Sequence, residues 1–169
     1  PESGAPEILD SVKKQVDLDN LQKAITITLN KGMKLSCFFV IGFPDETKAS
    51  LKQTLSFIRR ISIMGVHDVG VARFVPYPGS AIFKQLLQDD AVSLDDDFFM
   101  SPLDYYSSRA PSFSKEVSGR YTYWTMIWMY VNFYVLSFTI HPLRTMMILV
   151  RSIVTGREET RYSKWFVDQ

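Results

Sequence analysis

The sequence predicts an α/β protein built from parallel βα units and followed by a mostly helical C-terminal extension. Two apolar segments, 34–42 and 66–75, have the length of buried strands, and neither contains a proline. Segment 47–64, between them, has helical spacing of its apolar residues, and this alternation of strand and helix is typical of parallel sheets. The extension is indicated by residues 121–140, which run for twenty positions without a charged side chain.

Two helices are expected within residues 6–31. In the second helix, apolar side chains recur at three- and four-residue spacing and form one stripe: Leu18, Leu21, Ile25 and Leu29. Asp17 is placed to cap the start of this helix, and Gly32 stands where a C-terminal stop belongs. The spacing therefore predicts a helix that buries one face.

Segment 34–42 is almost wholly apolar, which predicts a strand buried on both faces, as in parallel sheets. The helix over 47–64 can begin at the capping residue Thr47 and end at Gly65. A short helix over 80–88 follows the second strand after a proline-rich turn. We expect the two strands to be adjacent and parallel.

Two parallel strands alone have two open edges and too little sheet area to cover their helices. The chain starts at Pro1 and shows no charged-then-apolar leader, so we expect no signal peptide. We expect further strands to precede this segment in a larger protein. Expressed alone, the segment is expected to be prone to aggregation.

The composition of the 169 residues excludes several classes of protein. With 46% hydrophobic and 22% charged residues, the chain is neither disordered nor collagen-like. Its formal net charge of +1 argues against a general nucleic-acid binder. Cys37 is the single cysteine, so the chain by itself cannot form an internal disulfide, a cysteine zinc site or an iron–sulfur cluster.

Residues 91–119 contain prolines and serines without a clear period, and we expect an extended connection there in which Asp95–Asp97 form a solvated acidic run. Segment 121–140 is long enough to span a membrane. Its polar side chains fall near one helical face, which favours instead a helix packed on a protein core or lying in a membrane interface: Thr122, Thr125, Asn132 and Thr139. A second apolar helix is expected over 143–155, closed by Gly156.

Three segments in order carry a resemblance to a known family: ESGAPEILDSVKK from Glu2, GMKLSCFFVIGFPDET from Gly32, and VGVARFVPYPGSAIF from Val69. The chain resembles, over about residues 1–90, the C-terminal half of a radical S-adenosylmethionine (radical SAM) barrel, most like the cobalamin-binding branch. The resemblance implies the C-terminal part of a (β/α)6 partial TIM-like barrel. It also implies SAM and a [4Fe–4S] cluster as cofactors, and cobalamin as a candidate one.

The resemblance also implies site residues. Glu2 and Ser3 resemble the end of the fourth barrel strand, where the family contacts the sugar or methionine part of SAM. Ile41 and Gly42 resemble the end of the fifth strand, where an apolar residue packs on adenine, and Glu46 braces the loop that follows.

Val75 and Pro76 resemble the end of the sixth strand, whose backbone edge reads adenine. This location agrees with the general position of ligands beyond the carboxyl ends of parallel strands. Without the resemblance, these segments are strand-to-helix turns and a rigid strand exit.

The sequence departs from the family because its CxxxCxxC cluster loop is missing from this chain. The chain alone is therefore expected to be inactive and to contain no metal site. Cys37 lies among apolar neighbours and is expected to be an inert buried thiol. His67 and His141 have no ligand-spaced companions and are expected to be structural.

The leading hypothesis is the SAM-adenosyl-binding part of a radical SAM enzyme that catalyses methylation, cyclisation or rearrangement of a small-molecule, or even lipid-like, substrate. The alternative is a non-enzymatic, membrane-associated helical module with a degenerate α/β remnant, in contact with the membrane through 121–155. An unrelated nucleotide binder is disfavoured because no glycine-rich phosphate loop is present. We expect a cytoplasmic location, with peripheral membrane attachment as the alternative, and no nucleic-acid partner.

Overall fold

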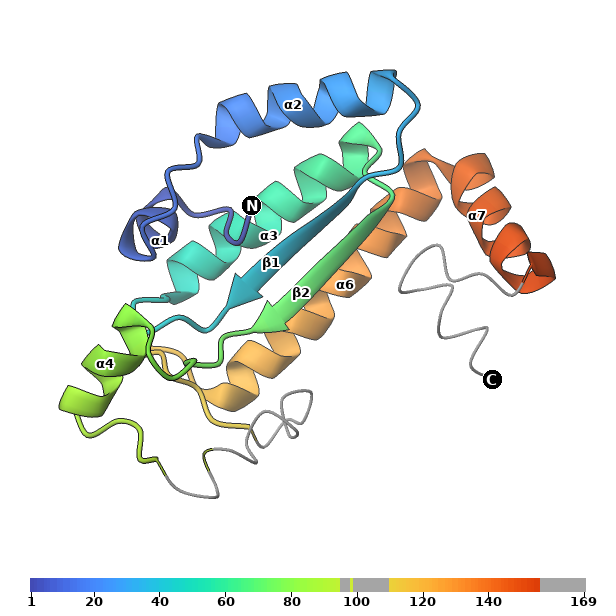
Figure 1. Ribbon diagram of the computed structural model, residues 1–169. Helices are drawn as coiled ribbons and strands as arrows, with labels where there is room; N and C mark the ends of the chain where they lie inside the picture. The colour runs from blue at the N-terminus through green and yellow to red at the C-terminus, as the bar shows by residue number, and fades with distance from the viewer. Residues whose placement is uncertain (95–97, 99–109, 156–169) are drawn as a thin grey trace.

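The computed structural model describes residues 1–94, 98 and 110–155, and the predicted acidic run Asp95–Asp97 and stop Gly156 lie outside these residues. The described chain is a mixed α/β structure with a two-stranded sheet (Figure 1). Its elements are, in order, α1 Pro6–Ser11, α2 Leu18–Asn30, β1 Ser36–Ile41, α3 Lys48–Met64, β2 Asp68–Arg73, α4 Ala81–Gln88, α6 Gly119–Ile140 and α7 Pro142–Thr155.

The predicted helix boundaries are confirmed by their caps. Asp17 Oδ1 accepts hydrogen bonds from the backbone amides of Asp19 and Asn20, which opens α2. Thr47 and Ser50 form a reciprocal capping box at the start of α3. Gly65 closes α3 in the left-handed conformation, with φ +100°, which costs glycine little because it has no Cβ.

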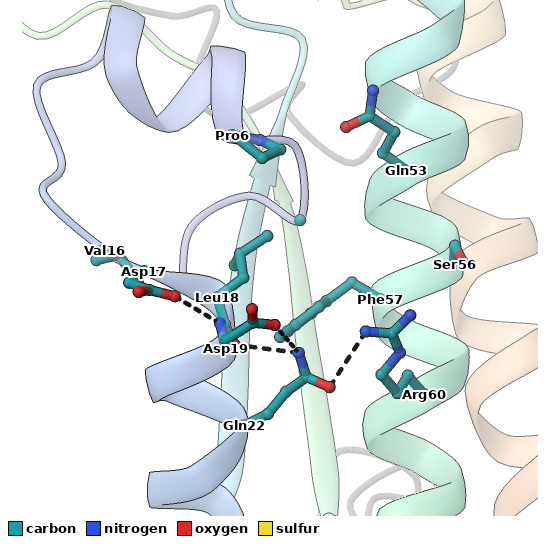
Figure 2. A pocket seen from close by; sticks show the side chains of 11 residues that line it. Pro6, Val16, Asp17, Leu18, Asp19, Gln22, Gln53, Ser56, Phe57 and Arg60 are labelled. Atoms are coloured by element: carbon teal, nitrogen blue, oxygen red, sulfur yellow. Dashed lines mark hydrogen bonds between the residues drawn. The ribbon is translucent and has the colours of Figure 1, made fainter.

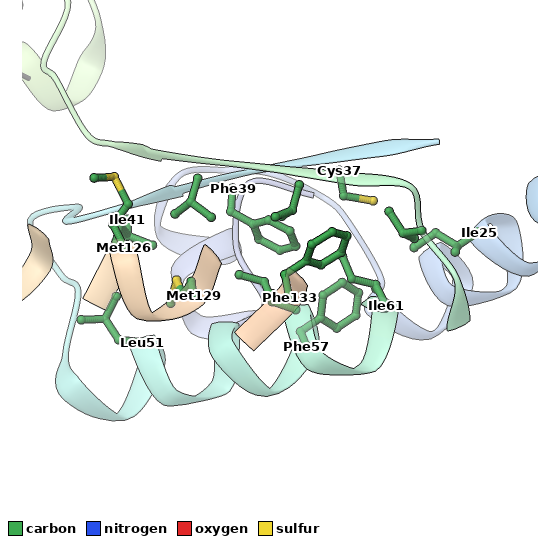
Figure 3. Packing of buried hydrophobic residues seen from close by; sticks show 14 of the residues in the cluster. Ile25, Cys37, Phe39, Ile41, Leu51, Phe57, Ile61, Met126, Met129 and Phe133 are labelled. Carbon is green, nitrogen blue, oxygen red and sulfur yellow. The ribbon is translucent and has the colours of Figure 1, made fainter. Parts of the chain in front are cut away.

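β1 and β2 pair in parallel, as predicted, with Ser36 opposite Asp68 and Ile41 opposite Arg73. α3 and α6 cover one face of this sheet (Figure 1). The main core lies between the sheet and these two helices (Figure 3). The sheet, α3 and α6 each supply fully or almost fully buried side chains to this core, including Phe39, Ile41, Val69 and Val71, then Leu51, Ile58 and Ile61, then Met126, Met129 and Phe133.

The prediction that the first strand is buried on both faces is wrong for the described structure. Burial alternates along β1: Cys37, Phe39 and Ile41 are buried, whereas Phe38 is 55% exposed. The physical reason is that the described helices α3 and α6 pack on one face only. On the other face Phe38 is exposed, and Val40 is only partly buried, against a small cluster of Ala5, Ile8 and Phe43.

Both edges of the sheet are engaged by other parts of the chain. On the β1 side, Glu2 forms a parallel bridge with Phe39: Glu2 N donates to Phe38 O (3.0 Å) and Val40 N donates to Glu2 O (2.7 Å). On the β2 side, the Tyr130 hydroxyl accepts from Val71 N (2.8 Å) and donates to Val71 O (3.0 Å). Residues outside the two strands thus satisfy backbone groups at each edge.

The long apolar helix α6 packs on the protein core, which is one of the two positions expected of it, but its polar side chains do not share one environment. Thr122 is buried on the inner side of α6, where its hydroxyl donates to Ser118 O, whereas Thr139 is exposed. The solvent side carries Trp124 and Trp128 instead, because the inner side is fully used for packing on α3 and β2. No helix of the described residues has the length and apolarity required to cross a membrane.

Candidate functional site

A tight loop joins β1 to α3 at the carboxyl end of the sheet. Gly42 adopts φ +89°, and its amide donates to Glu46 Oε2 (3.2 Å). Ser50 donates to the other carboxylate oxygen, and Glu46 N donates to Phe43 O (2.9 Å). The carboxylate of Glu46 is buried, with the residue 1% exposed, and it bonds to Gly42 at the end of β1 and to Ser50 in α3. Glu46 thus braces the loop as expected.

Burial raises the pKa of the Glu46 carboxyl above its ordinary value. Hydrogen bonds from the Ser50 hydroxyl and from the Gly42 and Phe43 amides act in the opposite direction, and the nearby Glu7 adds slightly to the rise. Burial outweighs these hydrogen bonds, so this carboxyl gains a proton more readily than a carboxyl in water does.

The segment that leads into α6 runs over this loop and ties it down. Ser114 Oγ donates to Glu46 O (2.8 Å), and Lys115 N donates to Pro44 O (3.1 Å). At the end of β2, the buried Arg73 donates from Nη2 to Ala110 O (2.7 Å) and to Pro111 O (3.0 Å). We call residues 110–118 the strap. No sequence pattern identified it, because its contacts are made mainly through backbone carbonyls.

A pocket of about 580 Å³ lies beyond the carboxyl ends of β1 and β2. Its wall is mainly apolar and aromatic, and the rings of Phe43 and Phe74 lie 4.9 Å apart. The lining residues are Glu2, Val40, Phe43, Ala72, Arg73, Phe74, Val75 and Tyr77. Pockets at this end of parallel strands are the usual ligand sites of α/β folds.

Two of the predicted site residues line this pocket, Glu2 and Val75. Glu2 has φ +70°, an uncommon conformation for a residue with a Cβ, and its carboxylate pairs with Lys14 Nζ at 2.7 Å. Val75 lies past the last ladder hydrogen bond, from Phe74 N to Ile41 O (2.8 Å). Pro76, next to Val75, is buried and is not among the lining residues.

Ile41 lies on the other face of the strand. Its side chain is fully buried in the core near Met126 (Figure 3), whereas Val40 lines the pocket. Successive side chains of a strand point to opposite faces, so a shift of one residue moves a contact from core to pocket. Ile41 therefore does not offer the exposed apolar surface expected of it, and the neighbouring Val40 lies on the pocket wall.

Ser3 is engaged in a structural contact with α3. Its hydroxyl lies 3.1 Å from Thr54 Oγ1, which also accepts from Gly4 N (3.1 Å). A Cβ on Gly4 would come within 2.6 Å of Phe57 Cβ, so the close approach requires glycine here. The Ser3–Gly4 pair thus positions Glu2 at the pocket rim by anchoring the chain to α3.

A second pocket, of about 510 Å³, lies between α2 and α3 and contains none of the predicted site residues (Figure 2). Gln22 crosses it, donating from Nε2 to Asp19 Oδ1 (3.4 Å) and accepting from Arg60 Nη1 (3.2 Å). The bond to Arg60 joins α2 to α3, so Gln22 and Arg60 of this groove already have protein partners.

Within the described ranges, no group of three or more His, Cys, Asp or Glu side chains is placed to hold a metal ion. Cys37 is buried in the core, where burial raises its thiol pKa. His67 Nδ1 accepts from Leu35 N (3.3 Å), and His141 Nε2 lies 2.9 Å from Ile63 O. These two histidines therefore bond to the backbone of neighbouring segments.

No family model matches the chain. The chain is similar to an uncharacterized protein of Methanopyrus kandleri, with 34% identity over 80 residues, which are 47% of this chain and 15% of that protein. It is also similar to an uncharacterized methyltransferase of Pyrococcus horikoshii, with 27% identity over 92 residues, 53% of this chain and 19% of that protein. The matches therefore span less than a fifth of either relative.

Proposed function

We propose that this chain supplies the adenosyl-binding part of a radical SAM enzyme. The observation that carries the proposal is the pocket at the carboxyl ends of β1 and β2, bounded by Val40, Phe74 and Glu2. Its support is the combination of three features at one end of the sheet: an apolar wall, a carboxylate at the rim and the loop braced by Glu46.

The pocket residues fit the two halves of an adenosine. Val40, Ala72 and Phe74 offer an apolar surface to the faces of the adenine ring. The backbone of Val75, beyond the ladder, is available to the edge of the base. The Glu2 carboxylate accepts hydrogen bonds from ribose hydroxyls, and its ion pair with Lys14 fixes its orientation.

In this proposal the two strands are the last two of a (β/α)6 partial barrel, and the sheet face that bears Phe38 and Val40 points to the barrel interior. The [4Fe–4S] cluster does not fit the residues of this chain, since Cys37 is its single cysteine and is buried. Cluster ligands and any cobalamin domain therefore belong to other residues of the intact protein. The Pyrococcus relative's name makes methylation the first reaction to test.

The test is equilibrium SAM binding by the intact protein under anaerobic conditions. Val40→Asp places a carboxylate on the apolar wall, and desolvating that charge is expected to weaken SAM binding on the order of a hundredfold. Ile27→Asp, at an exposed apolar position of α2, is the matched control and is expected to bind SAM as the wild type does. Iron and sulfide content should be equal in all three proteins.

Undiminished SAM binding by a folded Val40→Asp protein would refute the assignment of the pocket. The alternative function, a non-enzymatic membrane-associated module, makes the opposite prediction for the same experiment, because its wild type has no SAM site. The apolar outer side of α6 is the observation that favours this alternative.

A further inference from the structure

The solvent side of α6 carries a continuous apolar stripe. Its residues recur every three or four positions and are 39–58% exposed: Tyr121, Trp124, Trp128, Val131 and Val135. At 1.5 Å per residue, this outer stripe is about 21 Å long. Soluble proteins rarely expose large contiguous apolar patches, and such patches mark interaction sites, so we expect a partner for the outer stripe.

The opposite side of α6 fixes the helix in the core. Met126, Met129 and Phe133 are buried against the sheet and α3. Ser62 Oγ donates to Phe133 O (2.7 Å), and Arg59 Nε donates to Asn132 Oδ1 (2.8 Å). The helix therefore cannot turn its outer stripe inward without breaking the core, and what covers the stripe must approach from outside.

The apolar surface continues beyond the outer stripe. On α7, four apolar side chains at helical spacing are 54–77% exposed: Leu143, Met146, Met147 and Val150. An almost purely apolar hollow of about 470 Å³ lies beside the stripe, lined by Tyr130, Val131, Tyr134, Val135, Phe138 and Thr139.

The charges of this region all have one sign. The described residues 117–155 contain no aspartate or glutamate, and their charged side chains are Arg120, Arg144 and Arg151. Arg144 is partly buried and donates to Gly65 O and Val66 O, whereas Arg120 and Arg151 are exposed. A symmetric dimer formed through the outer stripe would bring together two surfaces that are both positively charged over residues 117–155. An anionic surface complements them.

We propose that the outer stripe of α6, with the exposed apolar side of α7, docks on the surface of an anionic lipid bilayer. α6 lies in the plane of the interface, with Trp124 and Trp128 at the level of the headgroups, where tryptophan is favoured. Arg120 and Arg151 meet the lipid phosphates, and the core side of α6 stays in the protein. The proposal is independent of SAM binding.

The test is flotation of the intact protein with large unilamellar vesicles, one set of phosphatidylcholine alone and one of phosphatidylcholine and phosphatidylglycerol in equal amounts. The wild type is expected to float with the mixed vesicles and more weakly with the neutral ones. Replacing both tryptophans, Trp124→Ser with Trp128→Ser, is expected to lower the partition coefficient about tenfold or more. Arg120→Gln should lower it about fivefold, on the mixed vesicles only.

The matched control is Tyr77→Ser, which removes an aromatic side chain that is 74% exposed at the pocket end of the molecule. It is expected to float as the wild type does. The proposal is overturned if the wild type stays out of the mixed vesicles or if the control loses as much binding as the double variant. Self-association through the outer stripe, seen as a dimer by sedimentation that the double variant abolishes, would also overturn it.

Discussion

The Tyr130 hydroxyl takes both backbone hydrogen bonds of Val71, accepting from its amide at 2.8 Å and donating to its carbonyl at 3.0 Å. A side chain from α6 thus occupies the place of a neighbouring strand at the outer edge of β2. Exposed strand edges invite pairing with other chains, so this contact protects the sheet as well as stabilising it.

Tyr130→Phe is expected to reduce the free energy of unfolding by about 1–3 kcal/mol, because it leaves two backbone groups of Val71 without this partner. Chemical denaturation followed by circular dichroism measures the change. Tyr123→Phe on the same helix, a half-buried tyrosine, is the control and should cost much less. An equal decrease in the free energy of unfolding in the two variants would contradict the stabilising role given to the Tyr130–Val71 contact.

Gly4→Ala is expected to destabilise the protein by about 1–3 kcal/mol, since the new Cβ would lie 2.6 Å from Phe57 Cβ and 2.8 Å from Thr54 Cα. The N-terminal segment must shift, and Glu2 shifts with it. Gly79→Ala, at a site with open space, is the comparison and carries only the cost of its φ of +89°. Thermal unfolding midpoints of both variants decide the matter; a larger drop for Gly79→Ala would contradict the packing argument.

Glu46→Gln should change how stability depends on pH. A folded-state pKa above the unfolded one means that Glu46 stabilises the fold fully below the unfolded value, 4.5, and that this contribution is lost as pH rises through the folded pKa. We therefore expect the stability of the wild type, relative to the glutamine variant, to fall as pH rises above 4.5.

Urea unfolding of both proteins over a series of pH values measures this difference. Asp10→Asn, which removes an exposed carboxylate of α1, should follow the wild-type profile. Parallel profiles for the wild type and Glu46→Gln would show that burial does not govern this carboxyl.

Cys37→Ala is expected to cost about 1 kcal/mol of stability, because it removes one buried heavy atom from the core. The iron content of the intact protein should stay unchanged. Iron stoichiometry after anaerobic purification, read beside the unfolding midpoint, checks both statements. A loss of iron without a loss of folded protein would show that this thiol reaches a cluster.

The elements of the fold were predictable because each rests on local signals. Asp17, Thr47 and Gly65 cap their helices as their residue types predict, and the two apolar runs pair in parallel. Which face of β1 and which face of α6 would be buried was not predictable from local signals. Phe38 and Trp128 are as apolar as the core side chains, and only the packing of α3 and α6 decides which of them face outward.

The candidate site was predicted in part. Glu46 braces its loop because its spacing from Gly42 brings the carboxylate back to that amide within one turn. The role expected of Ile41 was wrong because its side chain points to the core face of β1. Which face a side chain takes depends on the exact register of the strand, and an almost wholly apolar run does not reveal it. The strap contacts of Arg73 join residues 37 positions apart through backbone carbonyls, and no residue type signals such a contact.

The core depends on residues that are synthesised late. Phe133 meets the hydroxyl of Ser62, 71 positions earlier in the chain. At about 5–20 residues per second, a ribosome delivers Phe133 roughly 4 to 14 s after Ser62. β1, α3 and β2 are therefore made before the helix that completes their core. This part of the core can form only after residues 119–140 have been synthesised.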